Sequence, residues 1–171
     1  MIRFLVMDVD GTLTDGMIYM GETGEMCKAF NIKDGCGIKE LLPENGIIPI
    51  IITARESRIV VNRCRELGIT EIHQGVRKKL ECLEKIIAGY GTEEEGYSLE
   101  NAAYIGDDIL DIQCLQPIRE AGGLTGCPAD AMPAVKEICG YVAPHKGGEG
   151  AVRDFIEYII AGTHDKGHGK R

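Results

Sequence analysis

The chain has 171 residues, of which 44% are hydrophobic and 27% charged, and its formal net charge is −8. This length and balance are typical of one soluble globular domain, and an acidic chain without a basic stripe is a poor partner for nucleic acid. No apolar run approaches the roughly 20 residues that a membrane-spanning helix needs.

The seven cysteines are an odd number, and no two of them have C-x-x-C spacing. This pattern favours free thiols in a reducing cytosol over a disulfide framework or a zinc site. Asp8 and Asp10 interrupt the apolar N-terminus, so we expect no signal peptide and a cytoplasmic protein.

The first predicted strand covers residues 2–9 and ends at two carboxylates, Asp8 and Asp10, just before Gly11. The period of two in a strand places both acids on one side at its carboxyl end, where ligands bind in open α/β sheets. Two acids this close repel each other unless a cation or a shared proton relieves them. The pair therefore indicates a metal site, an acid/base site, or both.

Residues 16–30 break the pattern that follows, because two short strand-like runs flank a glycine-rich turn at 21–24. They predict a β-hairpin. Since the hairpin comes directly after the acid pair, it is interpreted either as a flap over the site or as a plain surface hairpin.

Helical and strand-like segments alternate along the rest of the chain. The predicted helices are residues 34–45, 56–67, 78–88, 108–115 and 151–161, and the predicted strands are 47–53, 71–73, 102–106 and a segment near 119–124. This rhythm predicts an α/β fold, a Rossmann-like three-layer sandwich with a mostly parallel sheet. We expect one domain over residues 1–162 and a mobile tail over 163–171.

Four short signals occur in an informative order, and three of them end predicted strands. They are the pair Asp8 and Asp10, then Thr53, then Lys79 at a helix start, then Asp107 with Asp108 and Asp111. Because parallel strands end at one edge of a sheet, we expect these groups to gather there.

This set resembles the four motifs of the haloacid dehalogenase superfamily of phosphatases. The resemblance implies that Asp8 is a nucleophile that forms an aspartyl-phosphate, and that Asp10 exchanges protons with the leaving oxygen and the attacking water. It also implies one Mg²⁺, held by Asp8, Asp107 and the main-chain carbonyl of Asp10, because magnesium prefers hard oxygen ligands.

The same resemblance implies that Thr53 donates a hydrogen bond to the substrate phosphate and that Lys79 offsets its charge. Lys78 is the alternative to Lys79. Asp108 and Asp111 are expected to orient the metal shell or Lys79. Taken alone, the Asp107-Asp108 pair would instead be interpreted as capping the following helix.

Two other protein classes that use clustered carboxylates match this sequence poorly. An EF-hand loop that begins at Asp8 needs glycine and glutamate where the chain has Leu13 and Tyr19. A response-regulator receiver domain needs its phosphorylated aspartate near residue 53, where the chain has Thr53.

Only the hairpin separates Asp15 from the helix near Asp34, so we expect a capless enzyme. Further segments resemble the 3-deoxy-octulosonate 8-phosphate phosphatase family, which includes relatives that act on 9-phosphates of nine-carbon keto acids. The segments are residues 15–16, 28–30, 34–37, 53–55, 74–75 and 147–153. The family resemblance implies a cytosolic, Mg²⁺-dependent homotetramer.

Two positions depart from this family. Ala54 stands where glycine is common, beside the expected phosphate contacts of Asp10, Thr53 and Lys79, and Glu149 stands where the octulosonate enzymes often have arginine. Arg55 is the candidate for binding the carboxylate of the sugar acid, with a surface ion pair as its alternative role.

The sequence therefore predicts an enzyme that hydrolyses the terminal phosphate of a 3-deoxy-2-keto sugar acid, with the eight-carbon substrate favoured. The alternatives are a nine-carbon 9-phosphate substrate, a broad-specificity small-molecule phosphatase, and a regulatory or assembly subunit without turnover.

Overall fold

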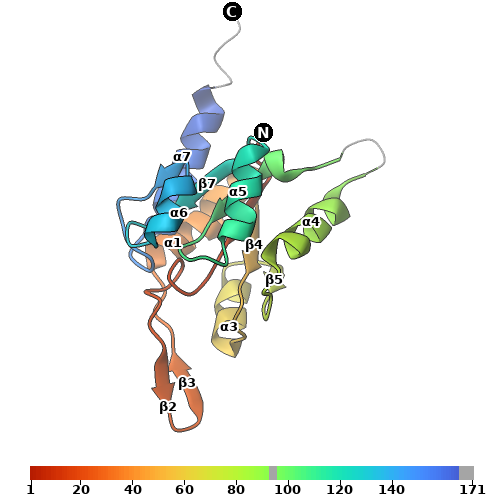
Figure 1. The fold of residues 1–171 in the computed structure, drawn as a ribbon. Helices are drawn as coiled ribbons and strands as arrows, with labels where there is room; N and C mark the ends of the chain where they lie inside the picture. The colour runs from red at the N-terminus through yellow and green to blue at the C-terminus, as the bar shows by residue number, and fades with distance from the viewer. Residues whose placement is uncertain (93–95, 166–171) are drawn as a thin grey trace, which may run out of the picture.

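The computed structural model describes residues 1–92 and 96–165, and its centre is a six-stranded sheet in the order β5-β4-β1-β6-β7-β8 (Figure 1). Every neighbouring pair in it is parallel. The strands are β1 (Phe4–Met7), β4 (Ile48–Ile52), β5 (Glu71–His73), β6 (Ala102–Ile105), β7 (Leu124–Cys127) and β8 (Tyr141–Val142).

The central strand β1 is buried on both faces, as a strand in a parallel sheet must be. Phe4 and Val6 join the core on one face, and Leu5 and Met7 join the core on the other. The continuous apolar run that begins the sequence is explained by this two-sided burial.

Helices cover both faces and give the predicted three layers. The first face packs against the π-helical turn η1 (Gly37–Leu41), α2 (Leu42–Glu44), α3 (Arg58–Glu66) and α7 (Ala151–Asp165), and α1 (Ile32–Cys36) packs against α7. The second packs against α4 (Lys79–Tyr90), α5 (Ile112–Glu120) and α6 (Pro133–Ile138). A short 3₁₀ turn, η2 (Leu99–Asn101), leads into β6. The Rossmann-like α/β prediction is confirmed.

The prediction was wrong at one strand and incomplete after it. The fifth strand of the sheet was expected near residues 119–124, but α5 continues through Glu120 because Leu115 and Ile118 bury its apolar face, and β7 begins only at Leu124. Elements α6 and β8 were not predicted, since each is too short for a periodic pattern to emerge.

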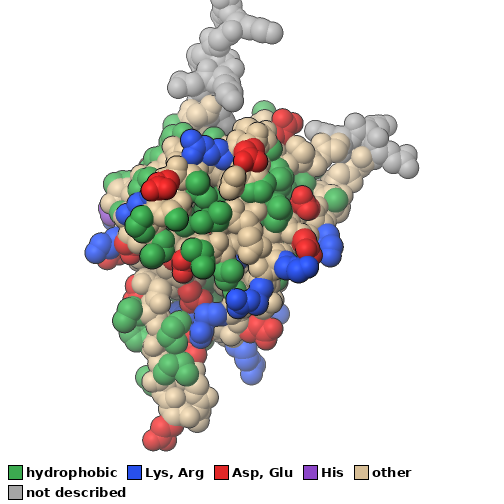
Figure 2. All heavy atoms as spheres, in the orientation of Figure 1, with side chains coloured by type: hydrophobic (Ala, Val, Ile, Leu, Met, Phe, Trp, Pro, Cys, Tyr) green, Lys and Arg blue, Asp and Glu red, His purple; other side chains and the backbone are tan. Residues whose placement is uncertain are grey.

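The predicted hairpin is present as β2 (Tyr19–Gly21) and β3 (Gly24–Cys27). Its strands project away from the sheet (Figure 1), while Glu25 of β3 contacts Ser57 and Arg55 after β4. Its apolar side chains are exposed, and Figure 2 shows them along the projecting arm; they are Met17, Ile18, Tyr19, Met20 and Met26.

The last helix is longer than the sequence pattern predicts. Helix α7 ends at Asp165, four residues beyond its predicted end, so it includes the first residues of the expected tail. The expected mobility of residues 166–171 concerns a segment outside the described residues. Among the helices described, we find none with the length and apolarity to cross a bilayer.

Asp34 of α1 is a buried carboxylate that joins two helices. Its Oδ1 accepts the N–H of Arg153 in the first turn of α7 at 2.8 Å, and its Oδ2 is buried without a hydrogen-bond partner. Burial raises the pKa of Asp34 to about 6, and the nearby Asp154 adds to the effect. Ionisation of Asp34 therefore destabilises the folded state.

We expect Asp34→Asn to remove a pH dependence of stability. Since the pKa of Asp34 is higher in the folded state, folding binds a proton, and stability falls as the pH rises from about 4 to about 6. The loss amounts to about 3 kcal/mol above that window. Urea unfolding at about pH 4 and pH 7 should show this slope in the wild type and a flatter one in the variant. An equal slope in both proteins would contradict the assignment.

Candidate active site

The carboxyl edge of the sheet gathers the groups that the sequence places after its strands. Asp8 follows β1, Thr53 follows β4, and Asp107 lies two residues after β6. Because β1 pairs with both β4 and β6, these three strand ends are neighbours. Asp8 and Thr53 are nearly buried, at 9% and 3% exposure.

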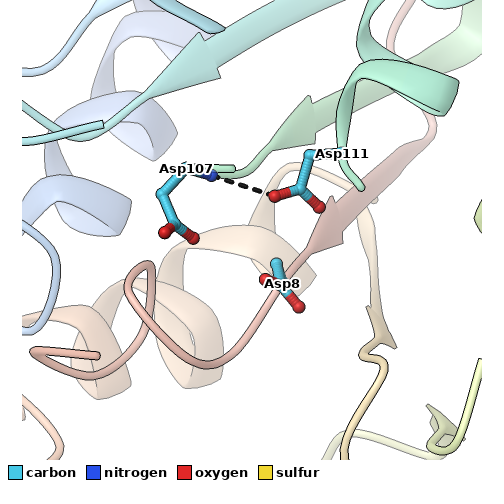
Figure 3. A group of neighbouring side chains, drawn as sticks. All are labelled: Asp8, Asp107 and Asp111. Carbon is cyan, nitrogen blue, oxygen red and sulfur yellow. Dashed lines mark hydrogen bonds between the residues drawn. The ribbon is translucent and has the colours of Figure 1, made fainter. Parts of the chain in front are cut away.

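Three carboxylates meet at this edge. Asp8, Asp107 and Asp111 each offer an oxygen within 4.8 Å of the others, and Figure 3 shows their side chains converging from the end of β1, the end of β6 and the start of α5. Burial, followed by repulsion from the neighbouring acids, raises the pKa of Asp8 to about 6 and that of Asp107 to about 8. A positive charge close to these carboxylates would therefore stabilise their ionised forms.

Lys79 supplies part of that charge. Its ammonium lies 2.9 Å from Asp8 Oδ1 and 2.7 Å from Asp111 Oδ1, and its side chain is 1% exposed. Burial lowers the pKa of Lys79, but the two acids outweigh burial and the net shift is upward. Lys78, the alternative considered from the sequence, is 78% exposed and pairs with Glu81.

Asp111 organises the cluster through a full set of hydrogen bonds. Its Oδ1 accepts from Lys79 and from the Tyr104 hydroxyl at 2.7 Å each, and its Oδ2 accepts the N–H groups of Asp107 and Asp108 at 3.0 and 3.2 Å. These bonds leave Asp111 less free than Asp8 or Asp107 to bind a metal. Asp108 itself is exposed and accepts the N–H of Ile109 at 2.7 Å.

The turn after β1 is shaped to hold Asp107. Gly11 has a φ of +92°, and a Cβ there would lie 2.2 Å from Asp107 Oδ2, so only glycine fits. Thr12 Oγ1 donates to Asp107 Oδ1 at 2.9 Å. The role of Thr12 was missed from the sequence, although the residue lies within the first motif.

A glycine segment supports this turn from behind. A Cβ on Gly147 would lie 1.9 Å from the carbonyl oxygen of Gly11, and the N–H of Gly148 donates to the carbonyl of Thr12 at 3.1 Å. Glu149, the departure noted in the sequence, is exposed. Close packing against the turn after β1 thus explains the glycines at residues 147 and 148, within the segment that resembles the family.

The residues present fit a hard divalent cation. Asp8 is buried and Asp107 partly buried, and their carboxylate oxygens lie close together and are only partly ionised without a cation. Such oxygens suit magnesium, whose shell is completed by water and phosphate.

Asp10 lies in a second group of charges that the sequence reasoning missed. The Lys28 ammonium contacts Asp10 Oδ1 and lies 2.9 Å from Glu25 Oε1, while Arg55 Nε lies 3.7 Å from Asp10 Oδ2. Glu25 also accepts the Ser57 hydroxyl at 2.6 Å. The only signal for Lys28 was the family resemblance at residues 28–30, and Glu25 had none.

The comparisons with known proteins agree with this geometry. A 3-deoxy-D-manno-octulosonate 8-phosphate phosphatase from Escherichia coli K12 is 42% identical over 159 residues, which cover 93% of this chain and 79% of the relative. No family model matches the chain.

Solved structures show the same similarity. The Yersinia pestis 3-deoxy-D-manno-octulosonate 8-phosphate phosphatase is 40% identical with a TM-score of 0.82, covering 94% of this chain and 81% of that one. The Moraxella catarrhalis enzyme, solved with a magnesium ion, a phosphate ion and KDO, is 36% identical with a TM-score of 0.84 and coverages of 94% and 86%. A cobalt-bound Haemophilus influenzae phosphatase is 33% identical with a TM-score of 0.83, covering 94% and 88%.

Proposed function

The chain belongs to the 3-deoxy-D-manno-octulosonate 8-phosphate phosphatase family of the haloacid dehalogenase superfamily, and on this premise we propose that it hydrolyses the terminal phosphate of an eight-carbon 3-deoxy-2-keto sugar acid. The observation that carries the proposal is the arrangement of Asp107 and the buried Asp8 and Lys79 at the carboxyl edge of the sheet. It offers a nucleophile, a fixed cation and a metal ligand within one site.

In the first half-reaction, an Asp8 oxygen forms a bond to phosphorus while the bond from phosphorus to the ester oxygen breaks. Asp10 donates a proton to that departing oxygen, which leaves as the sugar hydroxyl. In the second half-reaction, Asp10 takes a proton from water, and the water oxygen displaces the Asp8 carboxylate from phosphorus. Lys79 stays beside Asp8 and offsets the charge of the phosphoryl oxygens.

Mg²⁺, when bound by Asp8, Asp107 and the Asp10 carbonyl, would let an anionic nucleophile approach an anionic phosphate. The magnesium and cobalt ions of the two relatives support a divalent metal at this site. Thr53 and the backbone of Ala54 lie at the end of β4, where they would donate hydrogen bonds to phosphate oxygens.

We expect Mg²⁺ affinity to rise between about pH 6 and pH 8. The pKa of Asp107 is about 8 and that of Asp8 about 6 without the ion, so binding must displace protons, and each proton released steepens the affinity by up to about tenfold per pH unit. Calorimetry in two buffers with different ionisation enthalpies counts those protons directly. An affinity that stays flat across this range would contradict the shifted pKa values.

Arg55 is the group we propose for the carboxylate of the sugar acid. It is half-exposed at 47% and lies near Asp10, so its guanidinium faces both the site and solvent. We expect Arg55→Ala to raise KM about tenfold for the 8-phosphate of the sugar acid, because a charge-assisted hydrogen bond is lost. For a sugar phosphate without a carboxylate, the KM of Arg55→Ala should differ little from that of the wild type.

The matched control is Arg58→Ala, which removes an exposed arginine at the start of α3. The substrate panel compares kcat/KM for the eight-carbon acid, a nine-carbon acid 9-phosphate and simple sugar phosphates. A clear preference for the nine-carbon acid would change the substrate assignment. Similar rates on all of them would indicate a broad-specificity phosphatase, and no Mg²⁺-dependent turnover would indicate a regulatory subunit.

We also propose a homo-oligomer, a tetramer by family resemblance, that assembles through the projecting hairpin. The hairpin exposes Met17, Met20 and Met26 at more than 60% each, and apolar side chains gathered on one arm favour burial against another chain. Light scattering of the wild type and of Met20→Glu tests the assembly.

A cytoplasmic location is supported by the cysteines, which are all free.

A further inference from the structure

The base of the hairpin places the side chain of Lys28 in a partly buried ion pair with Asp10. Lys28 follows β3 directly, and its side chain is 1% exposed although it carries a charge. The only anions that contact its ammonium among the described residues are Asp10 and Glu25. A buried ammonium is costly unless it is paired, so these two contacts offset the cost of burying it.

We infer that Lys28 is a positioning residue for Asp10, and that Glu25 holds Lys28 in place. The inference rests on the proposed function, because it concerns the acid/base role of Asp10 in that reaction.

The two oxygens of Asp10 have different surroundings, which supports this assignment. Lys28 donates its hydrogen bond to Oδ1, whereas Arg55 Nε lies 3.7 Å from Oδ2, beyond hydrogen-bond distance. Fixing one oxygen of a carboxylate fixes the plane of the group. Oδ2 is then the oxygen that remains to exchange a proton with the ester oxygen and the water.

Glu25 ties this pair to the sheet. Its Oε2 accepts the Ser57 hydroxyl at 2.6 Å, and its Oε1 lies 2.9 Å from Lys28 and 3.5 Å from Arg55. Ser57 follows the loop after β4, so Glu25 links the hairpin to the loop that carries Thr53 and Arg55. The position of Asp10 therefore depends on a residue 15 positions further along the chain and on its partner across the site.

Leaving groups separate this role from a merely structural one. A sugar alkoxide leaves poorly and needs the proton from Asp10, whereas p-nitrophenolate leaves well without it. A variant that misplaces Asp10 therefore slows hydrolysis of sugar phosphates much more than hydrolysis of p-nitrophenyl phosphate. A variant that only loosens the fold slows both equally.

The experiment measures kcat/KM, which reports the steps up to departure of the leaving group, on a sugar phosphate and on p-nitrophenyl phosphate for Lys28→Met, Glu25→Gln and Asp10→Asn. We expect Lys28→Met to lose about 30-fold on the sugar phosphate and less than about fivefold on p-nitrophenyl phosphate. Glu25→Gln, which keeps the shape of the side chain and removes one of the two anions that hold Lys28, should show the same pattern with a smaller loss. Glu22→Gln, an exposed glutamate in the turn of the same hairpin, is the matched control.

Equal losses on both substrates, or no loss, in Lys28→Met and Glu25→Gln would overturn the inference while Asp10→Asn keeps its leaving-group dependence. If Asp10→Asn shows no such dependence, the acid/base assignment in the proposed function fails, and the inference fails with it. If Lys28→Met does not fold, Glu25→Gln decides the outcome alone.

Discussion

Asp8→Asn is expected to abolish phosphate release, lowering kcat by about 10⁴-fold or more, because an amide oxygen does not form the phosphoryl intermediate. The substitution keeps the size of the side chain and removes one of the charges that crowd the cluster, so the fold should be retained. Phosphate release measured with saturating Mg²⁺, alongside thermal unfolding, separates lost chemistry from lost structure.

Asp15→Asn is the control for that experiment. Asp15 lies in the same loop, is exposed, and accepts hydrogen bonds from Met17 and Tyr19 of the hairpin. We expect its activity to stay within about threefold of the wild type, as for most exposed polar substitutions. Substantial turnover by a folded Asp8→Asn protein would refute the nucleophile assignment.

Lys79→Met is expected to cost both activity and stability. Without Lys79, the buried Asp8 and Asp111 lose their shared cation, and breaking one side of a buried ion pair destabilises a fold by about 3–5 kcal/mol. The phosphoryl group also loses a fixed positive charge, which lowers kcat by about 10²–10³-fold. Urea unfolding and initial rates measure the two losses separately.

The stability loss should depend on pH in a defined direction. With Lys79 absent, the folded state holds protons on the acid cluster more tightly than the unfolded state does, so stability falls as the pH rises above the unfolded carboxylate pKa of about 4. The variant should therefore lose less stability at about pH 5 than at about pH 8. Lys78→Met, which removes an exposed lysine beside it, should match the wild type. An equal effect of the two substitutions would contradict the assignment of Lys79.

Local pattern was sufficient to predict the central strands and the acids that follow them. Asp8 and Asp107 could be placed together from the sequence because each follows a β-branched or apolar run, and parallel strands end at one edge. The boundaries of α5 and β7 could not be predicted, since burial of Leu115 and Ile118 extends the helix past Pro117, which ordinarily disfavours a helix interior.

The sequence by itself determined the α/β layering, the hairpin and the placement of Asp8 and Asp107 at one edge of the sheet, because strand period is a local property of the chain. Only the tertiary structure decided which lysine is buried against Asp8 and that both oxygens of Asp111 accept hydrogen bonds. It also decided that Lys28 contacts Asp10 and that Glu25 contacts Lys28. The physical reason is that these contacts join segments far apart in the chain, and their energies depend on burial, which spacing along the sequence does not encode.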